Sequence, residues 1–328
     1  MPKKLTEIER VWRFICGSSQ NGFYYINSNK HLCQWKKNKS ITIIDSFKCE
    51  IVEPWADGLL INENTLYSGS KIQKLFEGEI YSKSIIDNNS LLVRELDFIN
   101  EKVGYGVFDK TTSLINKIKT PSNIRPLHYL NENRIISQSE SDLYCHSIDG
   151  DIIWNRAFKE LINSSKGTIT KPLIKVGYSY FIGIGENKSD HLFNIDLESG
   201  KCDELKYFQF EFFFNNQEQL ITSQHQNTLL KLNLRTKEQE VWDVDELIKT
   251  AGFESVHDQR CQFDKNTFYF TQTLGDDRAK VGFLDTKIKE LTFSHKFQPN
   301  NGGISTIEQN ENQIFVCTQD NILHIFEK

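Results

Sequence analysis

The segment LYCHSIDGDIIW, Leu143–Trp154, carries the pattern from which the fold can be predicted. It consists of an apolar run that ends at Asp149-Gly150 and a second apolar run that begins two residues later. An Asp-Gly pair between two such runs favours a tight hairpin, because the central positions of that turn adopt positive φ. The segment therefore predicts two antiparallel strands, Leu143–Ile148 and Ile152–Phe158, joined by a two-residue turn.

Two further strands are predicted immediately before this hairpin. Apolar and polar residues alternate in Leu127–Leu130 and Arg134–Glu140, and the polar turn Asn131-Glu132-Asn133 separates the two runs. Alternation with a period of two is the signature of half-buried strands. The sequence thus predicts a four-stranded antiparallel sheet between Leu127 and Phe158.

The same layout recurs along the chain with a mean spacing of about 41 residues. Each repeat has one apolar anchor in its third strand, and the eight anchors are Leu32, Leu66, Val103, Leu143, Leu192, Leu229, Val281 and Ile322. A period of this length with four strands per repeat is typical of a β-propeller. We therefore predict an all-β fold, a single β-propeller of four-stranded blades. Eight blades are favoured and seven are the alternative, because Tyr67–Ser70 is a weak third strand for the second repeat.

The two ends of the chain are expected to share one blade. The last repeat stops at Lys328 after its third strand, and open sheet edges are an aggregation liability. Residues near Leu5–Ile8 can supply the missing outer strand, and Trp12–Cys16 would then begin the first blade. We therefore expect the N-terminal segment to close the ring, and we expect one domain over residues 1–328.

Composition and charge exclude several classes of function. The net charge of −5 argues against nucleic acid as a main partner, and no apolar run approaches the length needed to cross a bilayer. The first residues, Met1-Pro2-Lys3-Lys4, do not resemble a signal peptide. The seven cysteines are scattered and mostly fall in predicted strands, as buried reduced thiols do. We expect a cytoplasmic protein with no membrane contact.

Three segments resemble the repeat of the quinoprotein-like (PQQ-like) propellers, a pattern that WD40-like propellers share at the level of fold. Leu143–Trp154 has the apolar strand, the Asp/Gly turn and the tryptophan of that repeat; Leu192–Lys201 has the same turn, and Val241-Trp242 restores the tryptophan. Enzymes of this family are exported, bind pyrroloquinoline quinone and calcium, and use an active-site aspartate. This sequence has neither an export signal nor their neighbouring cysteine pair. The resemblance therefore implies the architecture, with no cofactor.

Loop lengths indicate which face of the blades could bind a partner. Turns between second and third strands, and crossings between blades, lie on one face, and the long insertions all belong to these two types. They are Asp97–Lys102, Lys159–Thr170, Gly185–Asp190, Asp245–Asp258 and Leu274–Ala279. We expect short helices at Lys159–Ile162 and Asp245–Lys249. Because functional residues gather on loops carried by a rigid scaffold, this long-loop face is the predicted binding face.

The candidate contact residues come from three of these loops. An aromatic anchor ringed by charges is the usual composition of an interface hot spot. The predicted partner-binding residues are Phe253, Glu254, His257, Asp276, Asp277, Arg278, Glu186, Lys188 and Asp190. The carboxylates at Asp276-Asp277 could also hold a cation or act as acid and base, but no calcium-loop spacing accompanies them. We predict no metal site and no catalytic residue.

Two functional hypotheses follow from these observations. The first is a non-catalytic cytosolic protein-binding propeller, monomeric by itself, which acts as an adaptor or scaffold or as an inhibitor or immunity-type protein against a basic partner. The alternative is an enzyme, or a small-molecule or ion-binding propeller, with its site in the central funnel. Strand residues expected to line such a funnel are Tyr24, Arg134, Tyr180 and Gln224.

Overall fold

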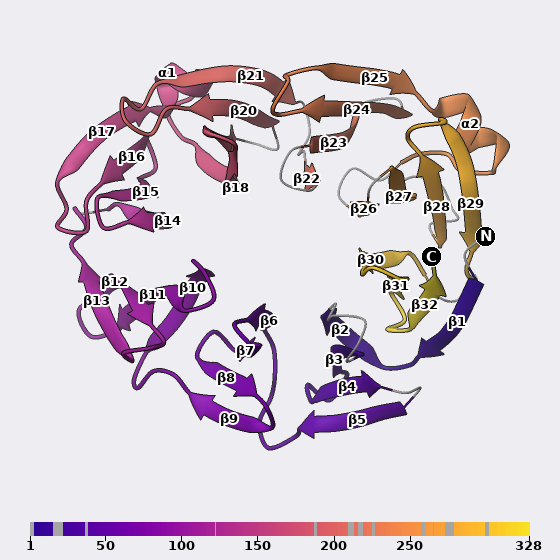
Figure 1. Ribbon diagram of the computed structural model, residues 1–328, viewed down its shortest axis with the longest axis horizontal. Helices are drawn as coiled ribbons and strands as arrows, with labels where there is room; N and C mark the ends of the chain where they lie inside the picture. The colour runs from indigo at the N-terminus through magenta and orange to yellow at the C-terminus, as the bar shows by residue number, and fades with distance from the viewer. Residues whose placement is uncertain are drawn as a thin grey trace. The chain divides into compact units, whose positions relative to one another are not determined.

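The computed structural model describes residues 3–15, 22–36, 39–121, 123–186, 189–208, 213–215, 219–224, 227–256, 260–264, 266–272, 279–298 and 302–328. Within these residues the chain forms eight four-stranded antiparallel sheets (Figure 1). They belong to two compact units, Glu50–Tyr207 (the 50–207 unit) and Met1–Cys49 with Phe208–Lys328 (the two-segment unit). The number of sheets confirms eight blades over seven.

The 50–207 unit contains four sheets, each made from four consecutive strands. The strands of the first two sheets are β6 (Val52–Trp55), β7 (Gly58–Ile61), β8 (Thr65–Ser68), β9 (Lys71–Lys74), β10 (Ile80–Ile85), β11 (Ser90–Asp97), β12 (Lys102–Asp109) and β13 (Leu114–Ile118). Those of the next two are β14 (Arg125–Asn131), β15 (Arg134–Gln138), β16 (Asp142–His146), β17 (Ile152–Ala157), β18 (Thr168–Val176), β19 (Ser179–Glu186), β20 (Ser189–Ile195) and β21 (Cys202–Phe208). The weak strand of the second repeat is therefore formed, as β8.

The two-segment unit contains the other four sheets. Three of them are built from consecutive strands: β2 (Val11–Ile15), β3 (Phe23–Asn27), β4 (Leu32–Lys36) and β5 (Lys39–Ile44); β22 (Phe213–Asn215), β23 (Gln219–Gln224), β24 (Thr228–Asn233) and β25 (Gln239–Asp243); β26 (Cys261–Asp264), β27 (Thr267–Thr271), β28 (Lys280–Asp285) and β29 (Glu290–Lys296). The fourth sheet has the order β1-β32-β31-β30, from β1 (Lys3–Ile8), β30 (Ile304–Gln309), β31 (Gln313–Thr318) and β32 (Leu323–Glu327).

The chain ends share a sheet, as the missing strand of the last repeat predicts. β1 pairs antiparallel with β32, with Lys3 opposite Glu327 and Ile8 opposite Leu323. Ile8 is buried in an apolar cluster with Phe315 and Leu323. The pairing gives β32 a neighbour on its second edge, so its backbone groups are not left open to another chain.

The hairpin from which the fold was predicted differs from expectation in its turn. The loop between β16 and β17 is closed by the Ser147 amide, which donates to the Asp151 carbonyl at 3.0 Å. Gly150 has φ of 90°, whereas Asp149 has no positive φ. The predicted two-residue turn is therefore wrong, and a longer loop with one left-handed glycine joins the strands. The strands themselves, β16 and β17, are confirmed.

A tryptophan joins this sheet to the next one in the 50–207 unit. The indole of Trp154 on β17 lies over Gly200, where an added Cβ would come within 2.5 Å of the ring. Its Nε1 donates to the Leu197 carbonyl at 2.9 Å. Trp55 makes the corresponding bond to the Asp87 carbonyl, at 2.8 Å, between the first two sheets of the unit. The Trp and Gly residues of the quinoprotein-like repeat thus act as packing partners between neighbouring blades.

Two short helices occur where they were expected. α1 (Phe158–Ile162) follows β17, and α2 (Asp245–Thr250) follows β25. Each buries one apolar residue, Phe158 and Ile248 respectively. No helix among the described residues is long and apolar enough to span a bilayer. Six cysteines lie in the described part of the chain as free thiols, and five of them are buried.

Lowering the pH is expected to destabilise the sheet that joins the chain ends. His324 on β32 is buried, with Nε2 3.2 Å from the Thr318 hydroxyl and Nδ1 3.2 Å from Glu7 of β1. Burial lowers the pKa of His324 from 6.5 to about 4. Between these values the unfolded chain takes up a proton that the folded chain does not, so stability falls as pH falls from 6.5 to 4.

The loss attributable to His324 is expected to be about 2–3 kcal/mol. Denaturant unfolding at pH 7 and at pH 4.5 measures it, with His324→Gln as the comparison because glutamine keeps a polar partner for Thr318 but does not titrate in this range. The variant should show the smaller pH dependence. Equal pH dependence of the two proteins would contradict a buried neutral His324.

Candidate functional site

Phe253 was predicted to be an exposed anchor for a partner, and that prediction is wrong. Its side chain is only 2% exposed and belongs to an apolar cluster with Val244, Ile248 and Phe270. The reason lies at the end of α2. Gly252 has a φ of 80°. Its amide donates a hydrogen bond to the Lys249 carbonyl, and the Phe253 amide donates one to the Ile248 carbonyl. This reversal is a Schellman motif, which turns the next apolar residue back onto the helix.

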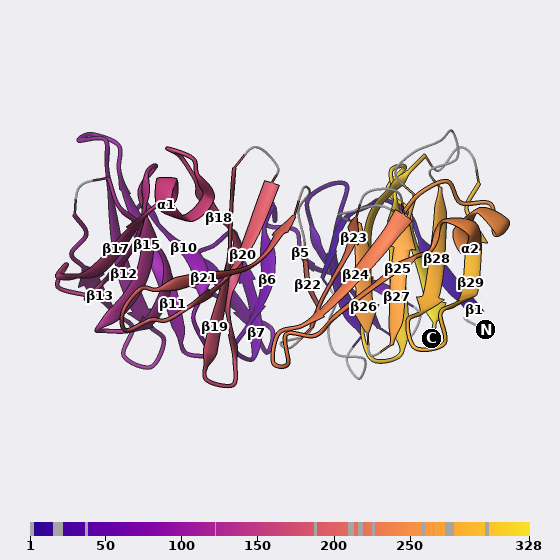
Figure 2. The same ribbon diagram turned by 90° about the horizontal axis from the view of Figure 1, so that it is seen from above.

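The other predicted contact residues are not gathered at one exposed place among the described residues. Glu254 is exposed, Glu186 is half-buried at the end of β19, and Asp190 on β20 is buried against Gly185. The predicted long loop at Gly185–Asp190 is instead a hairpin, in which β19 and β20 lie side by side (Figure 2). Five of the predicted residues lie outside the described residues: Lys188, His257, Asp276, Asp277 and Arg278.

The residues expected to line a funnel do not occupy edge strands. Tyr24, Arg134 and Tyr180 lie on β3, β15 and β19, and Gln224 lies on β23; each of these is the second strand of its sheet. Arg134 instead pairs with Glu198 of the neighbouring sheet. In the described part of the chain no three His, Cys, Asp or Glu side chains lie together where they could hold a metal ion.

One of the predicted long loops does present apolar side chains to solvent. It is the turn Phe98–Glu101 between β11 and β12, in the 50–207 unit. Phe98 is 71% exposed and Ile99 is 93% exposed. Below this tip, β11 and β12 pair without interruption at eight positions, from Ser90 opposite Asp109 to Asp97 opposite Lys102. A long hairpin of this kind holds its tip side chains away from the core.

Asp97 determines the conformation of this turn. Its carboxylate accepts hydrogen bonds from the amides of Ile99 and Asn100, at 3.1 and 3.0 Å, and from the Asn100 side chain at 2.8 Å. These donors lower the pKa of Asp97, the Asn100 side chain having the largest effect. Such an Asx turn depends on backbone amides rather than on the side chains at 98 and 99. The turn can therefore expose apolar residues without needing them for its own structure.

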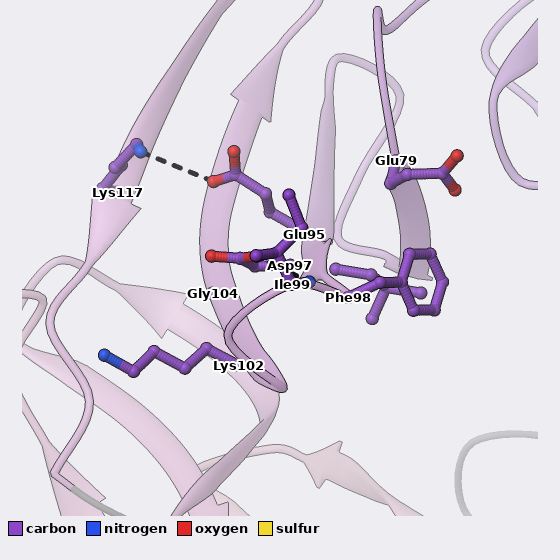
Figure 3. A pocket seen from close by; sticks show the side chains of 9 residues that line it. Glu79, Glu95, Asp97, Phe98, Ile99, Lys102, Gly104 and Lys117 are labelled. Atoms are coloured by element: carbon purple, nitrogen blue, oxygen red, sulfur yellow. Dashed lines mark hydrogen bonds and ion pairs between the residues drawn. The ribbon is translucent and has the colours of Figure 1, made fainter.

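A shallow open pocket of about 550 Å³ lies beside the turn (Figure 3). Its lining consists of Glu79, Glu95, Leu96, Asp97, Phe98, Ile99, Lys102, Gly104 and Lys117. Phe98 points away from Lys102 and Lys117, which lie on the other side of the hairpin. Lys117 pairs with Glu95 at 3.4 Å, and Glu79 accepts from the Tyr81 hydroxyl at 2.5 Å. We call this pocket together with the turn Phe98–Glu101 the hairpin surface.

The hairpin surface has an excess of negative charge. Glu79, Glu95, Asp97 and Glu101 contribute four carboxylates, against the two ammonium groups of Lys102 and Lys117. Asp97–Lys102 is one of the long loops named from the sequence, whereas the predicted contact residues come from other loops. The sequence signal for the exposed tip is Phe98-Ile99, two apolar residues between Asp97 and Asn100 in a predicted turn.

Comparison with known sequences identifies one distant relative of interest. No protein family model matches the chain. The chain is 25% identical over 240 residues to "Putative BTB/POZ domain-containing protein L76" of Acanthamoeba polyphaga mimivirus, a match that covers 67% of this chain and 41% of the viral protein. The chain therefore spans about two fifths of the length of that relative.

Comparison with solved structures defines the fold. The C-terminal WD40 domain of Sif2 matches with a TM-score of 0.65 at 9% identity, over 100% of this chain and 98% of that one. BamB from Moraxella catarrhalis matches with a TM-score of 0.55 at 10% identity, again over 100% and 98%. The chain has the WD40/PQQ-like propeller fold, as its repeat predicted. Identities this low establish the fold alone.

Proposed function

We propose that this chain is a protein-binding propeller that recognises a basic segment of its partner through the hairpin surface. The observation that carries the proposal is the exposure of Phe98 and Ile99 on a turn that does not need them. Exposed apolar residues rimmed by charges are typical of interaction sites. The similarity to a WD40 domain and to a viral protein named for a BTB/POZ domain supports the same class of function.

The chemistry of the hairpin surface defines the kind of partner. Burying an exposed phenylalanine and isoleucine contributes about 2–4 kcal/mol from apolar area. The four carboxylates around them favour Lys- or Arg-rich segments and speed the encounter with them. An adaptor and an inhibitor would use the same contact. Measuring the activity of the purified partner with and without this chain distinguishes the two roles.

The double substitution Phe98→Ser/Ile99→Ser is expected to weaken partner binding about 10- to 100-fold. The turn should remain intact because Asp97 bonds to backbone amides. Affinity purification from the cell that makes the protein identifies the partner, and titration of the purified partner with wild type and variant gives the ratio of dissociation constants. Binding should also weaken with salt, as expected for a basic partner.

Tyr178→Ser is the matched control for this experiment. Tyr178 is a fully exposed aromatic residue next to the left-handed Gly177, at the tip of the β18–β19 hairpin in the same unit. The control should bind the partner as wild type does. An equal loss of partner binding in the control and in the double variant would mean that any exposed apolar side chain contributes to binding non-specifically. Unchanged binding by the double variant would exclude the hairpin surface.

A further inference from the structure

β12 carries two glycines on one side of its sheet, and packing explains only one of them. Gly104 and Gly106 are two residues apart on the strand, so both belong to the same side. Gly106 is buried, and an added Cβ would lie 2.6 Å from the Ile115 side chain and 3.0 Å from the Asn116 carbonyl oxygen. The neighbouring strand β13 therefore requires a glycine at position 106.

Neither packing nor backbone conformation requires a glycine at position 104. Gly104 is exposed, and the three atoms nearest to an added Cβ all belong to Glu95, at the ordinary contact distances of 3.6 to 4.0 Å. Its φ lies outside the left-handed region, and the β11–β12 ladder has no bulge there. A glycine inside a strand weakens the strand, and it often marks a place where a ligand approaches the backbone closely. With the bend and the packing excluded, a close approach is the reason that is left.

A cationic side chain of the protein itself already crosses this part of β12. The strand lies between β11 and β13 in its sheet. Glu95 of β11 is opposite Gly104. Lys117 of β13 is opposite Gly106. The ion pair between Glu95 and Lys117, at 3.4 Å, therefore passes over the bare backbone of β12 (Figure 3). The pair shows which kind of group fits there, a long side chain with a cation at its end.

The pair between Glu95 and Lys117 can be exchanged with little loss of stability. The Lys117 side chain is 79% exposed and that of Glu95 is 50% exposed. Ion pairs between exposed side chains contribute little to folding, because water screens them and both side chains lose freedom. Gly104, Glu95 and Lys117 all line the pocket of the hairpin surface, so this pocket gives a partner access to them.

We infer that the bare backbone at Gly104 receives an arginine side chain of the partner, whose guanidinium group replaces Lys117 at Glu95. This inference rests on the function proposed above and names the residue of the basic segment that is recognised. A guanidinium group is planar and weakly hydrated, so it lies flat on a strand without side chains and donates two parallel hydrogen bonds to one carboxylate. The ammonium group of lysine is compact and strongly hydrated, and it gains less from a flat surface.

NMR titration with short blocked peptides tests the assignment of arginine. The probe has one arginine between two leucines, and its counterparts carry lysine or citrulline, which has a similar shape but no charge. Wild type should bind the arginine peptide at least about 5-fold more tightly than either counterpart, with a shift of the Gly104 amide resonance. Equal binding of the arginine peptide and either counterpart would overturn the inference, as would a Gly104 resonance that does not move.

Gly104→Val tests the role of the bare backbone. Valine favours strands, so the variant should melt about 1–2 °C higher than wild type, yet it should bind the arginine peptide at least about 10-fold more weakly. Asn116→Val is the matched control, because Asn116 is an exposed residue of β13 that is opposite Val107, on the other side of the sheet. The control should bind as wild type does. Wild-type affinity of Gly104→Val for the peptide would contradict the inference.

Lys117→Met tests the exchange at Glu95. The substitution keeps an unbranched side chain and removes the competing charge, so the arginine peptide should bind about 2- to 5-fold more tightly than it binds wild type. Lys159→Met removes an exposed lysine of α1 in the same unit and controls for the change in net charge. It should bind as wild type does. Unchanged or weaker binding by Lys117→Met would overturn the exchange.

Two variants separate this inference from the function on which it rests. If Phe98→Ser/Ile99→Ser loses partner binding while Gly104→Val binds both the partner and the arginine peptide as wild type does, the hairpin surface remains the binding site and the contact at Gly104 is excluded. If both variants bind the partner as wild type does, the proposed function and the inference fail together.

Discussion

Replacing Phe253 by alanine is expected to lower the free energy of unfolding by about 3–5 kcal/mol. The ring is enclosed by the apolar cluster that joins α2 to β24, β26 and β27, and its centroid lies 4.9 Å from that of Phe270. Truncation leaves a cavity that the surrounding sheet residues cannot close, because their backbones are held by ladder hydrogen bonds. Denaturant unfolding followed by tryptophan fluorescence measures the loss.

Glu254→Ala is the matched control for Phe253→Ala. Glu254 is the next residue along the chain and is exposed; its backbone amide bonds to Gln272 at 2.9 Å, which alanine preserves. The control should change stability by no more than about 0.5 kcal/mol. A Phe253→Ala variant as stable as this control, but defective in partner binding, would restore Phe253 as a contact residue.

Replacing Trp154 by alanine is expected to lower the free energy of unfolding by a similar amount, about 3–5 kcal/mol. Two contributions are lost together: the packing of the indole on Gly200, and the hydrogen bond from Nε1 to the Leu197 carbonyl at 2.9 Å. That carbonyl has no other partner in the described chain once the indole is gone, and an unpaired buried acceptor is costly. Because the contact joins two sheets, thermal unfolding should also become less cooperative.

Ile153→Ala provides the comparison for Trp154→Ala, since Ile153 is the preceding residue of β17 and points to solvent. Ile153→Ala should leave the free energy of unfolding nearly unchanged. Gly200→Ala tests the other side of the contact: Gly200 has φ of 69°, and the added Cβ would clash with the indole. Gly200→Ala should therefore destabilise as Trp154→Ala does. A neutral Gly200→Ala would show that the tryptophan contact is not important for stability.

The sheets could be predicted because each strand carries its own signal. In the fourth repeat the alternation of apolar and polar residues located β14 to β17 to within a few residues. The turn between β16 and β17 was mispredicted because Asp-Gly is compatible with more than one loop geometry. The Asp-Gly dipeptide by itself does not determine the register shift that occurs between Cys145 and His146.

The exposed apolar residues were harder to predict than the strands, because exposure is not a property of one residue type. Phe253 and Phe98 are both phenylalanines in predicted long loops, yet the first is buried and the second exposed. Gly252 after a short predicted helix was a usable signal for the first, since a Schellman reversal buries the residue that follows. Phe98 is carried outward because β11 and β12 stay paired as far as Asp97 and Lys102. The sequence alone does not give the register of that pairing.

The repeat of apolar runs and turns was sufficient to predict the all-β fold, the eight four-stranded sheets and the sharing of one sheet by the chain ends. These features arise from short-range patterns, because strands and turns are encoded over a few residues each. The contact of Trp154 with Gly200 shows what such patterns leave out. The two residues are 46 positions apart in the sequence and belong to different repeats. They meet because two neighbouring sheets pack against each other, and a contact between sheets exists only after the chain has folded.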